Sequence, residues 1–236
     1  MNEPNLALER HPFLVVSDIH ADAPALERVL EMVPDVRYRC SLGDVIGYSG
    51  HNPERAVDLV DGFNVGIRGN HDTLALGKNT PDIFNDRTAK TVEEHAKAIG
   101  QPGLDQLAQY AKTFKRKNML FVHGSPESEN DYLINETDIK RVLEENPEVD
   151  LMFGGHLHFP RIAEYDKKTG EVSFPELTFP LSRHFLDLEK KRYVVNVPAI
   201  AEDEGRMGYK QSGGTVLFHQ SETNKVLNIY FLPKEL

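Results

Sequence analysis

Five short segments of the chain carry side chains that can bind a metal ion. They are Asp18-Ile19-His20, Gly43-Asp44-Val45-Ile46-Gly47, Gly69-Asn70-His71-Asp72, His123-Gly124-Ser125 and Gly154-Gly155-His156-Leu157-His158. Half of the 10 histidines fall within them. The members of the pairs Asp18/His20 and His156/His158 are two residues apart. In extended backbone both side chains of each pair therefore project to the same side and can address one site.

The mixture of donor types favours a transition metal. Imidazole, carboxylate and one carboxamide suit Mn²⁺, Fe or Zn²⁺ better than Ca²⁺ or Mg²⁺, which prefer oxygen ligands throughout. The donors are too many for one tetrahedral ion: Asp18, His20, Asp44, Asn70, His123, His156 and His158. Two ions about 3.5–4 Å apart that share a carboxylate would use this set well. The flanking glycines allow sharp turns and close approach of a substrate.

Each of these segments directly follows an apolar run that is typical of a strand. The runs span residues 13–16, 36–42, 63–67, 119–122 and 149–153. Helical spacing of apolar residues predicts helices over 24–33, 53–60, most of 72–110 and 137–145. This alternation indicates βαβ units and a largely parallel sheet, in which ligands bind beyond the carboxyl ends of the strands. We therefore expect the five segments to converge on one crevice.

The last third of the chain is predicted to be rich in strands, over 161–165, 171–174, 192–197, 215–219 and 225–231. No flexible linker or repeat interrupts the 236 residues, so residues 1–236 are expected to form a single domain. The basic segment 112–117 has two interpretations, a solvated hairpin turn or a patch that steers phosphate, and the hairpin turn is favoured. The segment 171–192 is a candidate specificity element.

Composition excludes several classes of protein. With 39% hydrophobic and 27% charged residues the chain matches an ordinary globular protein. A net charge of −10 disfavours general nucleic-acid binding. The single cysteine, Cys40, forms neither an intrachain disulfide nor a zinc cluster. No signal-like start or run of 18 apolar residues is present, so we expect a cytoplasmic protein that does not bind membranes. The oligomeric state stays open.

The five motifs, in this order, resemble those of the calcineurin-like metallophosphoesterase superfamily, and in particular its compact single-domain bacterial and archaeal group. The resemblance covers about residues 13 to 160. It implies an α/β fold, a four-layer α/β/β/α sandwich of two mixed β-sheets flanked by helices. It implies two divalent metal ions, with Mn preferred and Fe, Zn or Ni also suitable. The implied ligands are Asp18, His20 and His158 for one ion, Asn70, His123 and His156 for the other, and Asp44 as the bridge.

The same resemblance implies a metal-dependent phosphoesterase. Two cations would lower the pKa of a bridging water, so that hydroxide attacks a small phosphodiester, phosphomonoester or nucleotide. The acidic composition suits a small phosphorylated substrate better than a long polyanion. His71 is implied as proton donor or charge stabiliser at the leaving group, with Asp44 or Asp72 orienting its ring. The implied catalytic residues are therefore His71 and Asp44.

Two other functions are weighed against this one. A phosphoprotein or dinucleoside-polyphosphate phosphatase is the alternative within the enzymes, and a non-catalytic scaffold with the same fold is the alternative outside them. Gly47-Tyr48-Ser49-Gly50 stands where protein Ser/Thr phosphatases carry Asp-Arg-Gly, which counts against a protein phosphatase.

Further polar residues lie close to the motifs or between them. His51 and Arg68 are predicted to contact substrate, the alternatives being a helix-entry turn for His51 and a solvated side chain for Arg68. The histidines outside the motifs are predicted to be structural: His11, His95, His184 and His219.

Overall fold

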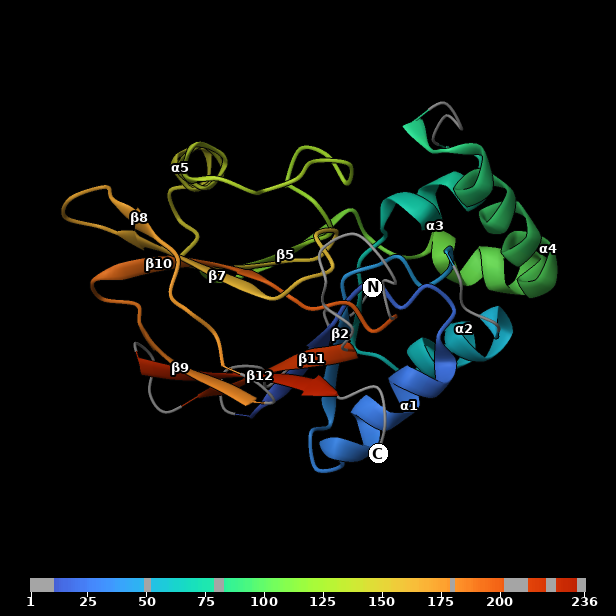
Figure 1. Cartoon of the computed structure of the whole chain (residues 1–236), viewed down its shortest axis with the longest axis horizontal. Helices are drawn as coiled ribbons and strands as arrows, with labels where there is room; N and C mark the ends of the chain where they lie inside the picture. The colour runs from blue at the N-terminus through green and yellow to red at the C-terminus, as the bar shows by residue number, and fades with distance from the viewer. Residues whose placement is uncertain are drawn as a thin grey trace.

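Two six-stranded sheets lie face to face in the computed structural model (Figure 1). The structure describes residues 11–48, 52–78, 83–178, 181–201, 212–219 and 224–232. Sheet 1 runs in the order β3 (Val65–Gly66), β2 (Tyr38–Ser41), β1 (Phe13–Val16), β11 (Ser212–His219), β12 (Asn224–Leu232) and β9 (Leu181–Asp187). Sheet 2 runs in the order β4 (Thr113–Arg116), β5 (Met119–Val122), β6 (Leu151–Gly154), β10 (Lys191–Asn196), β7 (Arg161–Asp166) and β8 (Val172–Ser173).

Both sheets are mixed, with their parallel pairs next to one another. In sheet 1, β1 pairs with β2 and β2 with β3 in parallel, while β11, β12 and β9 add antiparallel pairs. In sheet 2, β6 pairs in parallel with β5 and β10. The parallel strands therefore end on the same side within each sheet, which is where the predicted ligands follow them.

The inner faces of the two sheets form the main core. Phe13 and Val15 of β1 pack in the same cluster as Phe121 of β5 and Phe153 of β6. The rings of Phe121 and Phe153 stack with centroids 5.2 Å apart. All four residues of β1 are buried, because its other side chains point to the helices on the opposite face of the sheet.

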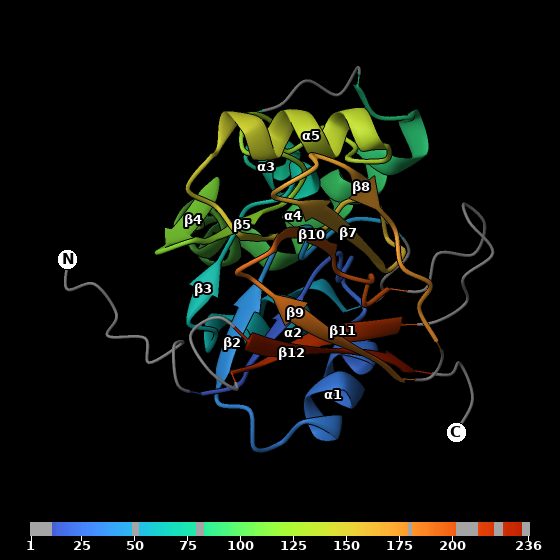
Figure 2. The ribbon, with the colours of Figure 1, turned by 90° about the vertical axis from the view of Figure 1, so that its left-hand side faces the viewer.

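Helices cover the outer faces of both sheets. Leu14 and Val16 of β1 share a cluster with α1 (Ala23–Met32), α2 (Pro53–Asp61) and α4 (Asp86–Ala108). On the other side, α5 (Glu136–Glu145) packs on sheet 2 through Ile139, Val142 and Leu143. Figure 2 shows α5 above and α1 below the two sheets. The layers are therefore α/β/β/α, as the family resemblance implied.

Polar side chains determine where these helices begin. The side chains of Asp22, Asn52, Asn85 and Asn135 each accept the backbone N–H three residues later, at 2.9 to 3.4 Å. Such N-caps satisfy donors that the first helical turn leaves free. A further short helix, α3 (Asn70–Ala75), follows β3 directly. Among the described residues no helix combines the length and the apolar character needed to cross a membrane.

The structure departs from the predicted elements at three places. The strands predicted within 13–67 and those predicted within 119–153 do not share one largely parallel sheet. Strands β1 to β3 lie in sheet 1, whereas β5 and β6 lie in sheet 2. The helical expectation over 72–110 divides into α3 and α4, with a kink in α4 at Gly100, whose φ is +60°. The basic segment 112–117 belongs to a hairpin, as favoured from the sequence: it contains β4, which pairs antiparallel with β5 across a turn at 117–118. The structure also adds β9.

Candidate metal centre

The five predicted segments meet at one place, between the ends of the two sheets. The loops after β1 and β2 run side by side, with the amides of Asp18 and His20 donating to the carbonyls of Gly43 and Asp44 at 3.0 and 2.9 Å. Across the sheets, the amide of His156 donates to the carboxylate of Asp18 at 3.0 Å. These bonds connect loops far apart in the sequence, so the convergence is built into the backbone.

Many of the predicted ligands have a backbone conformation that L-residues rarely adopt. The φ angles range from +46° to +66° at Asp18, His20, Asp44, His156 and His158. Left-handed backbone of this kind is costly for residues other than glycine and gathers at functional sites. The neighbouring glycines are required by close contacts. A Cβ on Gly69 would lie 2.1 Å from Asp44 Oδ1, and one on Gly155 would lie 1.9 Å from Ser17 Oγ.

The first group of donors consists of Asp18, His20 and His158, whose donor atoms lie within 4.8 Å of one another. His158 Nε2 is 3.2 Å from His20 Nε2 and 3.4 Å from Asp18 Oδ1. His20 Nε2 lies 3.9 Å from the same carboxylate oxygen. All three donor atoms therefore face one small volume.

The second group consists of Asp44, His123 and His156. Asp44 Oδ2 is 3.4 Å from His123 Nε2, and it is also 3.8 Å from His20 Nε2 in the first group. The carboxamide of Asn70 lies 3.1 Å from His123 Nε2 and next to the Asp44 carboxylate. The Asn70 carboxamide thus lies between His123 and Asp44, within reach of the second group of donors.

Backbone carbonyls set the orientation of two of the imidazoles. His20 Nδ1 lies 3.3 Å from the carbonyl oxygen of Ile46, and His123 Nδ1 lies 2.9 Å from that of Leu42. Donation from Nδ1 leaves Nε2 as the atom with a lone pair, as in histidines that bind metals. His156 Nε2 is buried and has no hydrogen-bond partner among the residues that the structure describes. The Nε2 atoms are thus available as ligands.

Asp18, Asp44 and His156 have the protonation states of metal ligands, whereas His123 holds a proton that a cation would have to displace. Burial acts to raise the pKa of Asp18 and Asp44, but the nearby imidazoles, chiefly His158 and His123, outweigh it and hold both pKa values well below the usual range. Burial lowers the pKa of His156 to about 4, so its imidazole is neutral. Burial also acts to lower the pKa of His123, but Asp44 raises it to about 9. A bound cation would replace that proton.

The donor set fits divalent cations. Asp18 and Asp44 are 0% and 1% exposed, and within the described part of the chain their only ion-pair partners are histidines. Two buried carboxylates without a lysine or arginine are unfavourable unless another positive charge compensates them. His156 Nε2, which has no hydrogen-bond partner in the described part of the chain, points to the same conclusion.

His71 lies beside this cluster, at the start of α3. Its Nε2 is 3.7 Å from Asp44 Oδ2, and its amide donates to Asp44 Oδ1 at 2.9 Å. Its Nδ1 packs against Gly47 without a hydrogen-bond partner among the described residues. Burial lowers the pKa of the His71 imidazole. Asp44 is therefore the carboxylate that faces His71.

Asp72 does not orient the His71 ring, contrary to one of the two expectations for it. Its carboxylate accepts the amides of Asp44, Val45 and Gly69 at 2.9 to 3.0 Å. Asp72 thus fastens the loop after β2 to the start of α3. Burial, with the nearby Asp44 charge, raises the pKa of Asp72 to about 7.

Sequence reasoning missed two residues of the site. His95 of α4, predicted to be structural, accepts the amide of Gly47 on Nδ1 at 3.1 Å and so supports the loop beneath His71. Tyr48 contacts three imidazoles, with ring centroids 4.5 Å from His20, 4.7 Å from His71 and 5.6 Å from His158. The position of Tyr48 directly after the second motif was the available signal.

The described residues and segments predicted to contact substrate outside the five motifs are not found in the cleft lining. Arg68 does not line the open cleft that leads to the donor cluster. Its guanidinium instead donates to the carbonyl oxygen of Tyr110, just beyond α4, at 3.5 Å. His51 lies outside the described residues. The basic segment 112–117 is not part of the cleft either, and its Lys115 pairs with Glu148. Within its described part, the segment 171–192 contributes no residue to the lining of this cleft.

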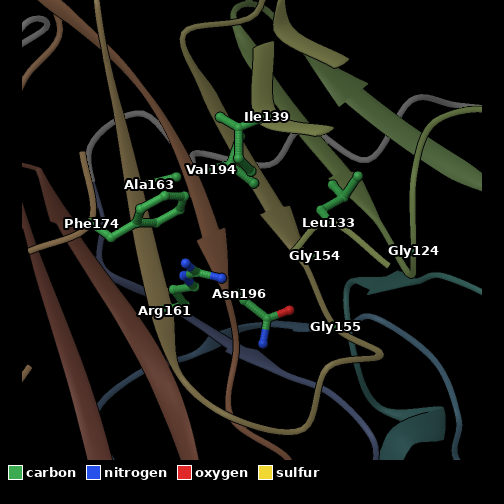
Figure 3. A pocket seen from close by; sticks show the side chains of 10 residues that line it. All are labelled: Gly124, Leu133, Ile139, Gly154, Gly155, Arg161, Ala163, Phe174, Val194 and Asn196. Atoms are coloured by element: carbon green, nitrogen blue, oxygen red, sulfur yellow. The ribbon is translucent and has the colours of Figure 1, made fainter. Parts of the chain in front are cut away.

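An open cleft of about 230 Å³ leads to the donor cluster. Its walls include Asp44, Asn70, His71, His156 and His158. A separate hollow beneath α5 has a volume of only about 10 Å³, where Arg161 lies across the ring of Phe174 at 3.7 Å (Figure 3). A space of that size holds at most one water molecule, whereas the cleft beside the donor cluster has room for a small substrate.

Comparison with known proteins agrees with this geometry. The model of the family described as calcineurin-like phosphoesterase matches residues 11–160, which is more than half of the chain. The chain belongs to the calcineurin-like phosphoesterase family. It is accordingly a hydrolase of phosphoric ester bonds, and its Asp and His clusters are those of a family that binds divalent metals.

Relatives of this phosphoesterase occur in archaea and bacteria. Uncharacterized protein MJ0912 of Methanocaldococcus jannaschii is 29% identical over 197 residues, covering 80% of this chain and 75% of that protein. A metallophosphoesterase structure from Sphaerobacter thermophilus has a TM-score of 0.75 at 24% identity, covering 95% of this chain and 89% of that one. The hypothetical protein PH1004 from Pyrococcus horikoshii has a TM-score of 0.67 at 16% identity, covering 94% and 89%. These two structures share the fold.

Proposed function

We propose that this phosphoesterase holds two divalent cations and hydrolyses a small phosphodiester, phosphomonoester or nucleotide. The proposed ligands are Asp18, His20 and His158 for one cation and Asn70, His123 and His156 for the other. Asp44 would serve both. The observation that carries this assignment is the position of Asp44 Oδ2, 3.8 Å from His20 Nε2 and 3.4 Å from His123 Nε2. The mixed nitrogen and oxygen donors favour Mn²⁺, and Fe, Zn²⁺ and Ni²⁺ are compatible with them.

The chain's own residues would divide the remaining work. Bound divalent cations supply an activated water and offset charge on the phosphoryl oxygens. His71, next to Asp44, is placed to hold a proton for the departing oxygen of the ester. Burial lowers its pKa, and an anionic phosphoryl group bound beside it would favour the protonated imidazole. Substrate binding would therefore charge His71 at the moment when a proton is needed.

A small substrate fits the cleft best. The described lining residues include no lysine or arginine, so a long polyanion would meet no cationic side chain there. The net charge of −10 also opposes polyanion binding, and we expect neither nucleic acid nor membrane as a partner. The cytoplasm remains the expected compartment.

Purified protein tests this function directly. Hydrolysis of bis-aryl and mono-aryl phosphates is expected with Mn²⁺, and elemental analysis at saturating Mn²⁺ is expected to give two ions per chain. A lack of turnover with every divalent metal tried would refute the enzyme assignment. A stoichiometry near one would refute the two-cation arrangement while leaving hydrolysis open to a single-ion mechanism.

The role of His71 is tested separately. His71→Ala is expected to lower kcat/KM by a factor of about 10² or more, because the proton donor is lost. Its metal content should stay unchanged, since the proposed ligands remain. The exposed His11 serves as the control, and His11→Ala should behave as wild type. Unchanged activity in His71→Ala would remove its catalytic assignment.

A further inference from the structure

Aromatic side chains stand next to the donor cluster on two separate segments. Tyr132 comes from the loop between β5 and α5, and Phe84 comes from the residues just before α4. Both line the same cleft. Tyr132 stacks on His156 with centroids 4.0 Å apart and an interplanar angle of 27°. Phe84 meets the His71 ring edge-on at 5.2 Å and 82°. Each ring is thus fixed directly against a residue of the proposed reaction centre.

The Tyr132 side chain remains partly exposed in the cleft wall. The residue is 47% exposed although one ring face is stacked. The neighbouring Ile83, also in the cleft wall, is 53% exposed. Large apolar side chains that stay exposed at the mouth of a polar cleft commonly mark a binding surface.

The loop that carries Tyr132 is held by its own hydrogen bonds. The hydroxyl of Ser125 donates to Asp131 at 2.7 Å and accepts the amides of Glu127 and Ser128 at 3.2 and 3.0 Å. The amide of Ser125 donates to the carbonyl oxygen of Ser128 at 2.8 Å. Tyr132 is therefore presented on a pre-ordered loop, which lowers the entropy lost when it binds a ligand.

The rest of the described lining tells what kind of group would be bound there. Apart from the donor cluster it holds aromatic, aliphatic, amide and hydroxyl side chains and no lysine or arginine: Tyr48, Ile83, Phe84, Asn85, Thr88, Asn130 and Tyr132. Beyond the phosphoryl group, a substrate would thus be recognised by ring stacking and neutral hydrogen bonds. Stacking on tyrosine and phenylalanine favours a planar aromatic group over an aliphatic one.

We propose that Tyr132 and Phe84 form an aromatic subsite that binds a planar aromatic group of the substrate, next to its phosphoryl group. The subsite makes phosphoesters of nucleosides or aryl alcohols the preferred class over phosphoesters of aliphatic alcohols. Phe84 lies on the side of His71 and so contacts the leaving group, whereas Tyr132 lies on the side of His156. This inference rests on the proposed function for the position of the phosphoryl group.

Binding of uncleavable phosphonates tests the subsite without turnover. Calorimetry on the Mn²⁺-saturated protein would compare two matched pairs. The first is the phosphonate analogue of AMP against that of ribose 5-phosphate, and the second is benzylphosphonate against cyclohexylmethylphosphonate. The aromatic member of at least one pair is expected to bind about fivefold tighter or more, the lower end of the effect of one stacked base. A preference in the first pair alone identifies a nucleobase as the group, and one in both pairs identifies any aryl ring. Equal binding within both pairs would overturn the subsite.

Variants show whether the two rings carry that preference. Tyr132→Ala and Phe84→Ala are each expected to bring the ratio of the two dissociation constants within a pair toward one. Tyr132→Phe is expected to keep the wild-type ratio. Ile134→Ala is the matched control, because Ile134 is 48% exposed on the same loop but does not line the cleft. Binding of inorganic phosphate should change by less than about twofold in every variant. The proposal would be overturned if the preference for the aromatic phosphonate persists in both alanine variants. It would also be overturned if these variants lose affinity for inorganic phosphate as much as for the aromatic phosphonate.

The outcomes separate this proposal from the proposed function. A clear aromatic preference in a protein that hydrolyses no phosphoester with any metal would refute the proposed function and keep the subsite. Rapid hydrolysis of aryl phosphates with equal binding within both phosphonate pairs would refute the subsite and keep the proposed function.

Discussion

Replacing Gly47 with alanine tests whether the loop after β2 positions the His71 ring. Gly47 has a φ of +123°, and a Cβ built on it would lie 2.2 Å from His71 Nδ1 and 3.0 Å from His20 Nδ1. Real Cβ contacts are essentially never shorter than 3.0 Å, so the His71 ring would have to move by about 1 Å. A misplacement of about 1 Å in a reacting group can lower the rate by about 10²-fold.

Gly47→Ala is expected to change two quantities, the free energy of unfolding and kcat/KM. Alanine at a φ of +123° strains the backbone by about 1–3 kcal/mol, which lowers the free energy of unfolding. Displacement of the ring adds the loss in kcat/KM. Gly77 offers a matched control just beyond α3, because its φ is +65° and nothing lies within 4 Å of an added Cβ. Gly77→Ala should therefore lose about 1 kcal/mol of stability with kcat/KM within twofold of wild type.

The assay combines urea unfolding with hydrolysis of an aryl phosphate by the Mn²⁺-loaded proteins. Both alanine variants should unfold at lower urea concentration than wild type. Only Gly47→Ala should lose about 10²-fold in kcat/KM, with little change in its metal content. Wild-type kcat/KM in a folded Gly47→Ala would refute the reasoning, since the ring would then tolerate the contact. An equal activity loss in Gly77→Ala would show that strain alone is responsible.

Three further predictions address the metal centre and the core. Asp44→Asn should lower the affinity for both cations by about tenfold or more. Elemental analysis that finds only one cation bound more weakly would contradict a bridging role. Burial raises the pKa of the Cys40 thiol, so Cys40 should react with a disulfide reagent only after denaturation, and stoichiometric labelling of the native protein would refute this. Burial raises the pKa of Tyr110 and Tyr193 to about 12. These tyrosines ionise near pH 10 in the unfolded chain, so their contribution to stability is complete below about pH 10 and declines toward pH 12. Urea midpoints measured across this range should fall, less steeply in Tyr193→Phe.

The ends of the central strands could be predicted from the sequence because their signals are local. A run such as residues 13–16 is short, wholly apolar and buried on both faces, and it stops at polar residues and a turn. Five such runs, each followed by Asp, Asn or His, were enough to locate the donor cluster. The division of these strands between two sheets has no local signal, because it depends on which distant strands pair.

The strand β9 illustrates what local reasoning misses. It lies at the edge of sheet 1 and pairs with β12, about 40 positions later in the chain. Leu181 and Phe185 are exposed on it, so burial does not produce a clear hydrophobic pattern. The contact that His95 makes with the site was missed, and Asp72 was given the wrong partner, for a similar reason. Each acts on backbone amides of a loop that only the tertiary structure brings near.

The hydrogen bond between the His156 amide and the Asp18 carboxylate places the donor cluster across the seam between the two sheets. His20 and His158, which face each other there, are 138 positions apart in the chain. A cation bound by both histidines would act as a reversible cross-link between these two positions of the chain. A covalent cross-link closing about 100 residues restricts the unfolded chain by roughly 4–5 kcal/mol. Cation loading would therefore couple the melting of one sheet to that of the other, and a chelator would loosen the whole molecule as well as stop catalysis.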